Sequence, residues 1–237
     1  MVSLFPLNLR GATVRRKSRR LLGPVDLTLD AHSMTILMGP NGSGKTTLLR
    51  LMHGVERLSD GSAQWALDDT TAQRKQAYVF QTPIMLRRTV GENLFYPLAL
   101  RGVSKRDAAG QVRDWAERIG LGQAIDRHAP RLSGGEKQKL ALARALIAKP
   151  EVLFLDEPCA NLDGASTRDI ETLLRAAIDS GTQIIMATHD IGQMRRLGVF
   201  GLFLQGGQLR ETGPIKTLLT DPQSPALRAF IDGDIVE

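Results

Sequence analysis

The fold of this chain is decided by the stretch Gly39-Pro40-Asn41-Gly42-Ser43-Gly44-Lys45-Thr46-Thr47. It matches the pattern Gly-x-x-x-x-Gly-Lys-Ser/Thr, in which glycines let the backbone fold tightly enough for successive N–H groups to point at one anion. Lys45 is expected to put its charge between the β- and γ-phosphates, and the Thr46 hydroxyl is expected to bind Mg²⁺. We therefore predict that all nine residues bind a nucleoside triphosphate, with Thr46 as a metal ligand.

The segments on either side of this loop have the required patterns. Residues 35–38 form an apolar run typical of a short buried strand, and residues 48–52 have a helical pattern. A helix that starts directly after the loop points its positive end at the bound phosphates. Strand, loop and helix follow in the order that such a loop needs, which disfavours a chance match.

The composition is that of an ordinary globular protein. The chain has 237 residues, of which 42% are hydrophobic and 24% are charged, enough for a sizeable core. Its apolar runs are shorter than the roughly 18 to 20 residues that span a bilayer, and its first residues do not resemble a secretory signal. The single cysteine, Cys159, fits a reducing compartment. We expect a soluble, cytoplasmic protein in which Cys159 is a packing residue.

The net charge of +6 raises the question of a nucleic-acid partner. The dense basic run covers residues 15–20 and lies between two apolar segments, as in an exposed hairpin. Aromatic residues, which would stack on bases, make up only 5% of the chain. A solvated or nucleotide-facing loop is the favoured interpretation, anionic lipid headgroups come second, and we expect no nucleic acid to bind.

Strand-like and helix-like segments alternate at both ends of the chain but not in its middle. Strand signals vanish between Pro83 and Ala148, where helices are predicted over residues 107–119 and 135–148. The pattern predicts one α/β domain over residues 1–237, with a core (1–82 and 151–237) and an inserted helical subdomain (83–150). The predicted strands are residues 7–10, 25–29, 35–38, 77–80, 152–155, 183–188, 201–204 and 208–210, and the other predicted helices are 48–52, 165–178, 217–219 and 226–231.

Two acids follow a buried strand late in the sequence. Residues 152–155 are apolar, and Asp156 and Glu157 come directly after them. Parallel α/β sheets bind ligands at the carboxyl ends of their strands. Asp156 is predicted to hold Mg²⁺ opposite Thr46, and Glu157 to polarise an attacking water as a catalytic residue. The alternative is a strand end with two solvated acids.

A second anion-binding helix start is predicted at Ser133-Gly134-Gly135. Ser133 is a good N-cap, the glycines expose backbone N–H groups, and a long helix follows. Taken alone, such a cap is common and usually structural.

Taken together, six motifs in order resemble the ABC-type ATPases. They are the phosphate loop, Gln81, Leu132 to Gln138, Asp156-Glu157, the turn Ala160 to Asp163, and Thr188-His189-Asp190. The resemblance covers essentially the whole chain. It implies a P-loop NTPase core with a mixed sheet, an inserted helical subdomain and an N-terminal antiparallel β region. It also implies ATP and Mg²⁺ as ligands.

The family resemblance implies roles for single residues. Two copies would pair head to tail, so that Ser133 and Gly135 of one contact the γ-phosphate bound by the other. Gln81 would sense Mg²⁺ and the attacking water, and His189 would hydrogen-bond the γ-phosphate. With Glu157 and Lys45, these two form the expected catalytic set. His32, His53 and His128 are expected to be structural.

The chain departs from the family at one position. An aromatic residue that stacks on adenine often precedes the second strand, but here that position falls within Arg15, Arg16 and Lys17. We hypothesise that the planar guanidinium of Arg16 stacks on the base instead.

The partner that ATP hydrolysis drives is inferred from the same resemblance. Residues 81–88 and 92–98 resemble the surface on which importer subunits receive short helices of a membrane-spanning permease. Ile84, Met85 and Leu86 are expected to form an apolar groove there, the alternative being ordinary core packing. We expect an importer-type ATP-binding subunit, peripheral on the cytoplasmic face of the membrane, that works with permease subunits and a substrate-binding protein. An oxyanion such as tungstate or phosphate is the suggested cargo. A soluble ATPase acting on DNA or ribosomes and an exporter subunit remain alternatives.

Overall fold

The computed structural model of the protein describes residues 3–234. Its centre is a six-stranded sheet in the order β5-β6-β7-β3-β8-β9, parallel except for β9. The strands β3 and β6 are buried along their whole length, as expected when helices or a second sheet cover both faces. The strands are β5 (Gln76–Val79), β6 (Val152–Asp156), β7 (Gln183–Ala187), β3 (Met34–Met38), β8 (Phe200–Gln205) and β9 (Gln208–Pro214).

Successive residues of the central strands point to opposite faces of the sheet and pack into two different apolar clusters. On β6, Phe154 packs with helix α1 (Lys45–His53) and the N-terminal strands. Its neighbours Leu153 and Leu155 pack on the opposite face, against helices of the second half of the chain. This period of two explains why the strand is continuously apolar. The covering helices are α5 (Gly134–Leu146), α6 (Gly164–Asp179), α7 (Ile191–Leu197), α8 (Ile215–Thr220) and α9 (Pro225–Asp232).

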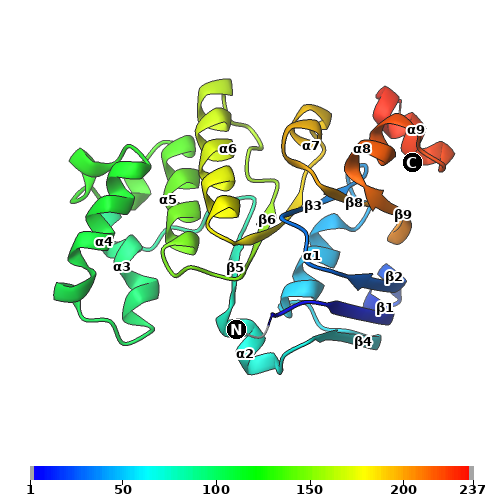
Figure 1. Ribbon diagram of the computed structural model, residues 1–237, viewed down its shortest axis with the longest axis horizontal. Helices are drawn as coiled ribbons and strands as arrows, with labels where there is room; N and C mark the ends of the chain where they lie inside the picture. The colour runs from blue at the N-terminus through cyan, green and yellow to red at the C-terminus, as the bar shows by residue number, and fades with distance from the viewer. Residues whose placement is uncertain (1–2, 235–237) are drawn as a thin grey trace.

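A second sheet of three antiparallel strands in the order β2-β1-β4 confirms the predicted N-terminal β region. It lies below and beside α1 in Figure 1. The strands are longer than predicted, and the basic run forms their hairpin tip, with Lys17 in the left-handed region at φ 57°. Strand β4 and the short helix α2 were not predicted from the sequence. The elements are β1 (Leu7–Arg16), β2 (Arg19–Leu29), β4 (Asp60–Trp65) and α2 (Asp69–Arg74).

The helices between residues 83 and 150 pack around a third apolar cluster, at the end of the molecule far from the small sheet (Figure 1). The helix α5 joins this cluster to the central sheet: Leu140 and Ala143 face the cluster, whereas Leu142 and Leu146 face the sheet. We keep the division into a core and a helical subdomain as a proposal. The remaining elements are α3 (Val90–Ala99), α4 (Lys105–Arg118) and the 3-10 turns Gly122–Ala124 and Ala129–Arg131.

Among residues 3–234, none of the helices combines the length and the apolar character that crossing a bilayer requires.

Candidate nucleotide site

The phosphate loop connects the end of β3 to the start of α1. Its first glycine, Gly39, has φ 145°, and a Cβ there would lie 2.1 Å from the carbonyl oxygen of Leu204. No other residue type fits this close approach. The loop wraps around the Lys45 ammonium, which donates to the carbonyl oxygens of Gly39 (2.8 Å) and Pro40 (3.0 Å). Burial lowers the pKa of Lys45, against the raising effect of the nearby carboxylates of Glu157 and Asp156.

The Asp156 carboxylate lies at the carboxyl end of β6 and is 3% exposed. Its Oδ1 accepts a hydrogen bond from the Thr46 hydroxyl at 2.9 Å. A carboxylate and a hydroxyl in contact are oxygen ligands of the kind that Mg²⁺ prefers. The residues present therefore fit a magnesium ion held by Asp156 and Thr46, with the Gln81 amide nearby.

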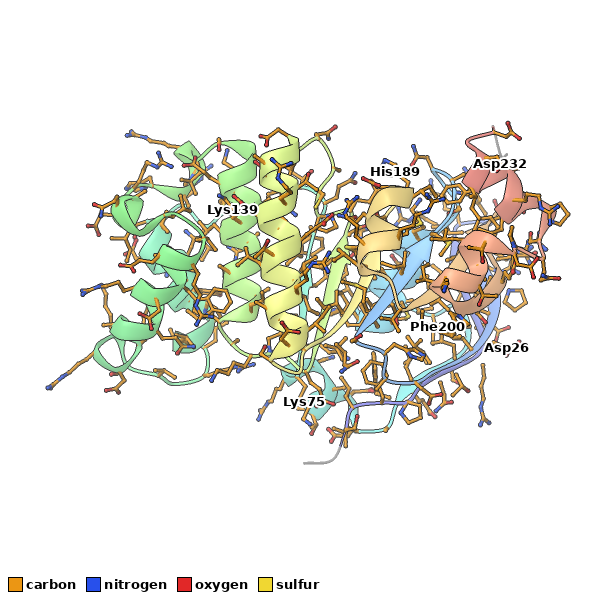
Figure 2. The ribbon with its side chains drawn as sticks, turned by 45° about the horizontal axis from the view of Figure 1, so that its top comes forward. Asp26, Lys75, Lys139, His189, Phe200 and Asp232 are labelled. Atoms are coloured by element: carbon orange, nitrogen blue, oxygen red, sulfur yellow. The ribbon has the colours of Figure 1, made fainter. Side chains whose placement is uncertain are left out.

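The Glu157 carboxylate, which follows β6, is surrounded by side chains that come after β3, β5 and β7. Its Oε1 lies 3.9 Å from Lys45 Nζ and 3.4 Å from His189 Nδ1, and its Oε2 accepts from Gln81 Nε2 at 3.2 Å. Lys45 follows the loop after β3, Gln81 follows β5, and His189 follows β7. Figure 2 shows His189 beside α7. The Glu157 backbone has φ 46°, a left-handed conformation that is uncommon for non-glycine residues and recurs at functional sites as well as in turns.

These side chains border one open cavity of about 550 Å³ beside the phosphate loop. The cavity brings together most of the predicted site residues and adds three residues to which the sequence gave no site role. Leu21 was not singled out at all, whereas Ala160 and Asn161 belong to the turn that the sequence named only as a family motif. Asn161 has φ 60°, a conformation in which Asn is enriched. The predicted residues on the cavity are Asn41, Gly42, Gly44, Lys45, Thr46, Thr47, Gln81, Glu157 and His189.

Other predicted residues lie elsewhere. Arg16 is exposed on the β1–β2 hairpin and is not among the residues that line the cavity, where Leu21 lies instead. Half-buried His53 packs edge-on against Tyr78, and His32 stacks on Phe200. Burial raises the pKa of Cys159 to about 11, so its thiol stays neutral at pH 7.

The helix start at Ser133 is built as a capping box. The Ser133 hydroxyl accepts from Glu136 N at 3.3 Å, and the Glu136 carboxylate accepts from Ser133 N at 2.8 Å. Gly135 is in close contact with helix α6, because a Cβ there would lie 2.8 Å from Ser166 Oγ. Ser133, Gly134 and Gly135 do not line the cavity of their own chain.

A lysine-bearing phosphate loop between β3 and α1, with carboxylates at the end of β6 two positions away in the sheet, defines a P-loop nucleoside triphosphatase. Within that class the chain belongs to the ABC transporter family, whose sequence model matches residues 22–160. It is an ATP-binding subunit of that family and an ATPase, as the six motifs implied.

The comparisons with individual proteins agree. The chain is 34% identical to a probable anion import ATP-binding protein of Haloferax volcanii, over 91% of this chain and 83% of that protein. It is 37% identical to the tungstate uptake system ATP-binding protein TupC of Peptoclostridium acidaminophilum, over 78% and 87% of the two chains. A solved ATP-binding subunit of an ABC transporter superposes with a TM-score of 0.82, at 20% identity and over 97% and 99% of the chains, which supports the fold.

Proposed function

We propose that Glu157 is the general base of this ATPase and that Lys45, Gln81 and His189 position the reacting groups. The proposal depends on one observation. The Glu157 carboxylate lies 3.9 Å from Lys45 Nζ, 3.4 Å from His189 Nδ1 and 3.2 Å from Gln81 Nε2. In this mechanism Glu157 accepts the proton of the attacking water. The Lys45 ammonium stabilises charge on the phosphates, and a bound Mg²⁺ would neutralise further phosphate charge.

The site is completed by a second copy of the chain. The helix tip is exposed at Ser133 and Gly134 but does not line its own cavity. An open helix N-terminus next to glycines suits an anion from another molecule. We therefore place Ser133 and Gly135 of one copy over the γ-phosphate held by Lys45 of the other, in a head-to-tail pair.

The test is Glu157→Gln, which keeps the shape of the side chain and removes the base. We expect ATP binding to persist and turnover to fall by about 10²- to 10⁴-fold, with the ATP-bound pair accumulating in size-exclusion chromatography. Hydrolysis by this variant near the wild-type rate would show that water is activated elsewhere.

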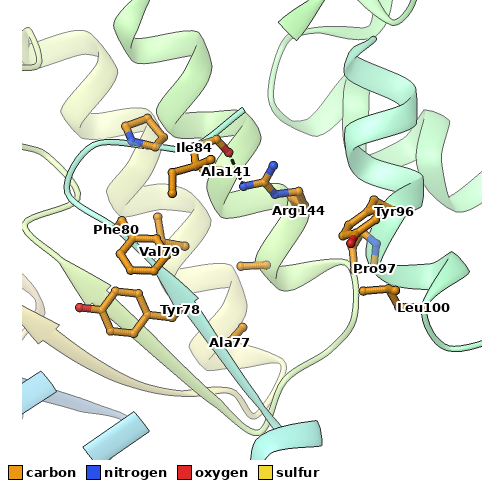
Figure 3. A pocket seen from close by; sticks show the side chains of 12 residues that line it. Ala77, Tyr78, Val79, Phe80, Ile84, Tyr96, Pro97, Leu100, Ala141 and Arg144 are labelled. Atoms are coloured by element: carbon orange, nitrogen blue, oxygen red, sulfur yellow. Dashed lines mark hydrogen bonds between the residues drawn. The ribbon is translucent and has the colours of Figure 1, made fainter. Parts of the chain in front are cut away.

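The permease is proposed to dock on an apolar groove of about 220 Å³ between β5 and the helices α3 and α5 (Figure 3). Ile84 is 62% exposed and Leu100 71% exposed, which is unusual for large apolar side chains and typical of interaction sites. The expected groove is only partly as predicted: Ile84 lines it, but Met85 packs into the interior because it lies between two apolar clusters.

To test the groove, Leu100→Asp is compared with Val55→Asp. Val55 is 54% exposed but does not line the groove. We expect Leu100→Asp to abolish co-purification with the co-expressed permease while ATPase activity of the free subunit is kept, and Val55→Asp to change neither. Equal loss in both variants would count against the groove.

For cargo, we propose import of an oxyanion, with an extracytoplasmic binding protein delivering it and this subunit peripheral on the cytoplasmic face. Two relatives named for anion import and for tungstate uptake support this choice. Uptake assays on the reconstituted transporter, with tungstate, molybdate, phosphate and sulfate in competition, test it. The Arg16 stacking hypothesis is tested separately: an unchanged ATP affinity in Arg16→Ala would reject it.

A further inference from the structure

Tyr78 lies behind the nucleotide site, on β5 at the edge of the central sheet. Its backbone pairs with Phe154 of β6, two residues before Asp156. The ring lies at the inner end of the groove, and Figure 3 shows the hydroxyl pointing away from Tyr96 and Leu100. That hydroxyl donates to Asp156 Oδ2 at 3.3 Å. The contact joins the groove and the nucleotide site through one side chain.

The two oxygens of Asp156 are therefore held by different elements. Oδ1 accepts from Thr46 at the start of α1, and Oδ2 accepts from Tyr78 on β5. The positive charge of Arg50 lies near the Tyr78 hydroxyl. Since Thr46 and Arg50 are four residues apart, they lie on the same face of α1. Helix α1 thus contacts Asp156 directly through Thr46 and approaches Tyr78 through Arg50.

The ring of Tyr78 is itself held in place. Its centroid lies 4.6 Å from the Phe80 ring and 5.4 Å from the His53 ring, and it stacks on Phe154 at 6.3 Å. A tyrosine hydroxyl carries its proton near pH 7 and so acts as a hydrogen-bond donor. A donor fixed by packing orients its acceptor at little entropic cost.

We propose that Tyr78 is a positioning residue that fixes the Asp156 carboxylate for Mg²⁺ by holding Oδ2 while Oδ1 stays on Thr46. This rests on the proposed role of Asp156 as a magnesium ligand. Groups that orient metal ligands typically change metal affinity by about 10- to 100-fold when removed. Because the Tyr78 contact is long for a hydrogen bond, the lower end of that range, roughly tenfold, is expected here.

The experiment measures Mg²⁺-dependent ATP binding in a Glu157→Gln background, which prevents hydrolysis. ATP affinity is determined by calorimetry as Mg²⁺ is raised from EDTA conditions, and the Mg²⁺ midpoint is the readout. We expect Tyr78→Phe, which keeps the ring, to raise this midpoint roughly tenfold. ATP affinity in EDTA should be unchanged.

Two reference variants distinguish a failure of the Tyr78 positioning role from a failure of the proposed magnesium site. His53→Phe alters the packing against the Tyr78 ring without removing the hydroxyl, and should leave the midpoint unchanged. Asp156→Asn should abolish the Mg²⁺ response. A normal midpoint in Tyr78→Phe, or an equal loss of affinity in EDTA, would overturn the positioning role while the role of Asp156 stands. A normal response in Asp156→Asn would instead overturn the proposed magnesium site, and the inference with it.

Discussion

The cavity around Lys45 and the tip of α5 at Ser133 both suit an anion, but one copy of the chain completes them to different degrees. In the cavity, Lys45 is 6% exposed and Glu157 is in contact with three other side chains. At the tip, Ser133 is exposed and its hydroxyl is already used by the capping box. The first region is preorganised by the fold, whereas we propose that the second serves the nucleotide of another copy. Binding and turnover should therefore respond differently to changes in the two regions.

The largest expected effect is that substitutions in the two regions impair different properties, ATP binding in the cavity and turnover at the helix tip. Lys45→Ala should lower ATP affinity roughly 100-fold, because it removes charge-assisted contacts to phosphate. Ser133→Arg should keep ATP binding by the single copy but lower turnover at least about 100-fold, because it blocks the helix tip. Calorimetry and a phosphate-release assay check the two outcomes.

Mixing the two inactive variants provides the control. In a head-to-tail pair of one copy of each, one of the two sites contains both an intact Lys45 and an intact Ser133. Random pairing of independent sites would restore about a quarter of wild-type turnover. Normal turnover by Ser133→Arg alone would refute the difference between the regions.

A smaller effect is expected where the tip contacts helix α6. Gly135→Ala would place a Cβ 2.8 Å from Ser166 Oγ, and we expect it to lower the free energy of unfolding by about 1–2 kcal/mol. Gly134→Ala is the matched control, because a Cβ there has no atom within 4 Å. Denaturant titration measures both variants, and adding Ser166→Ala to Gly135→Ala should recover part of the loss. Equal stability of the two alanine variants would contradict the close contact.

The smallest effect concerns the contact between α6 and α7, the helix that follows His189. Buried Glu171 accepts two hydrogen bonds from Arg196 Nε and also contacts Arg196 Nη2 at 2.6 Å, so it links α6 to α7, which follows His189. Glu171→Gln should cost about 1 kcal/mol, since Arg196 is 48% exposed. Asp169 lies on the same helix as Glu171 but is exposed, and Asp169→Asn, which breaks its pair with Lys139 of α5, should cost less than about 0.5 kcal/mol. Equal losses in thermal unfolding would show that burial of the acid has no influence.

Much of the fold was predictable because its signals are local. The parallel strands are apolar runs that end at polar residues, and the phosphate loop needs its glycines in order. Strand β4 was missed because Asp60–Trp65 is mostly polar and half-exposed. It is a strand because β1 pairs with it, Leu7 opposite Trp65, and pairing with a distant segment leaves little trace in the strand itself.

The sequence by itself determined the family and indicated which residues we propose for phosphate and Mg²⁺, because a glycine loop with lysine and hydroxyl, and two acids after a buried strand, permit few other chemistries. Only the tertiary structure decided that Tyr78 holds Asp156, that Leu21 and Asn161 border the cavity, and that Ser133 lies outside it. These relations depend on strand order and helix packing, which place residues far apart in the chain within a few ångströms of each other. No spacing along the sequence encodes them.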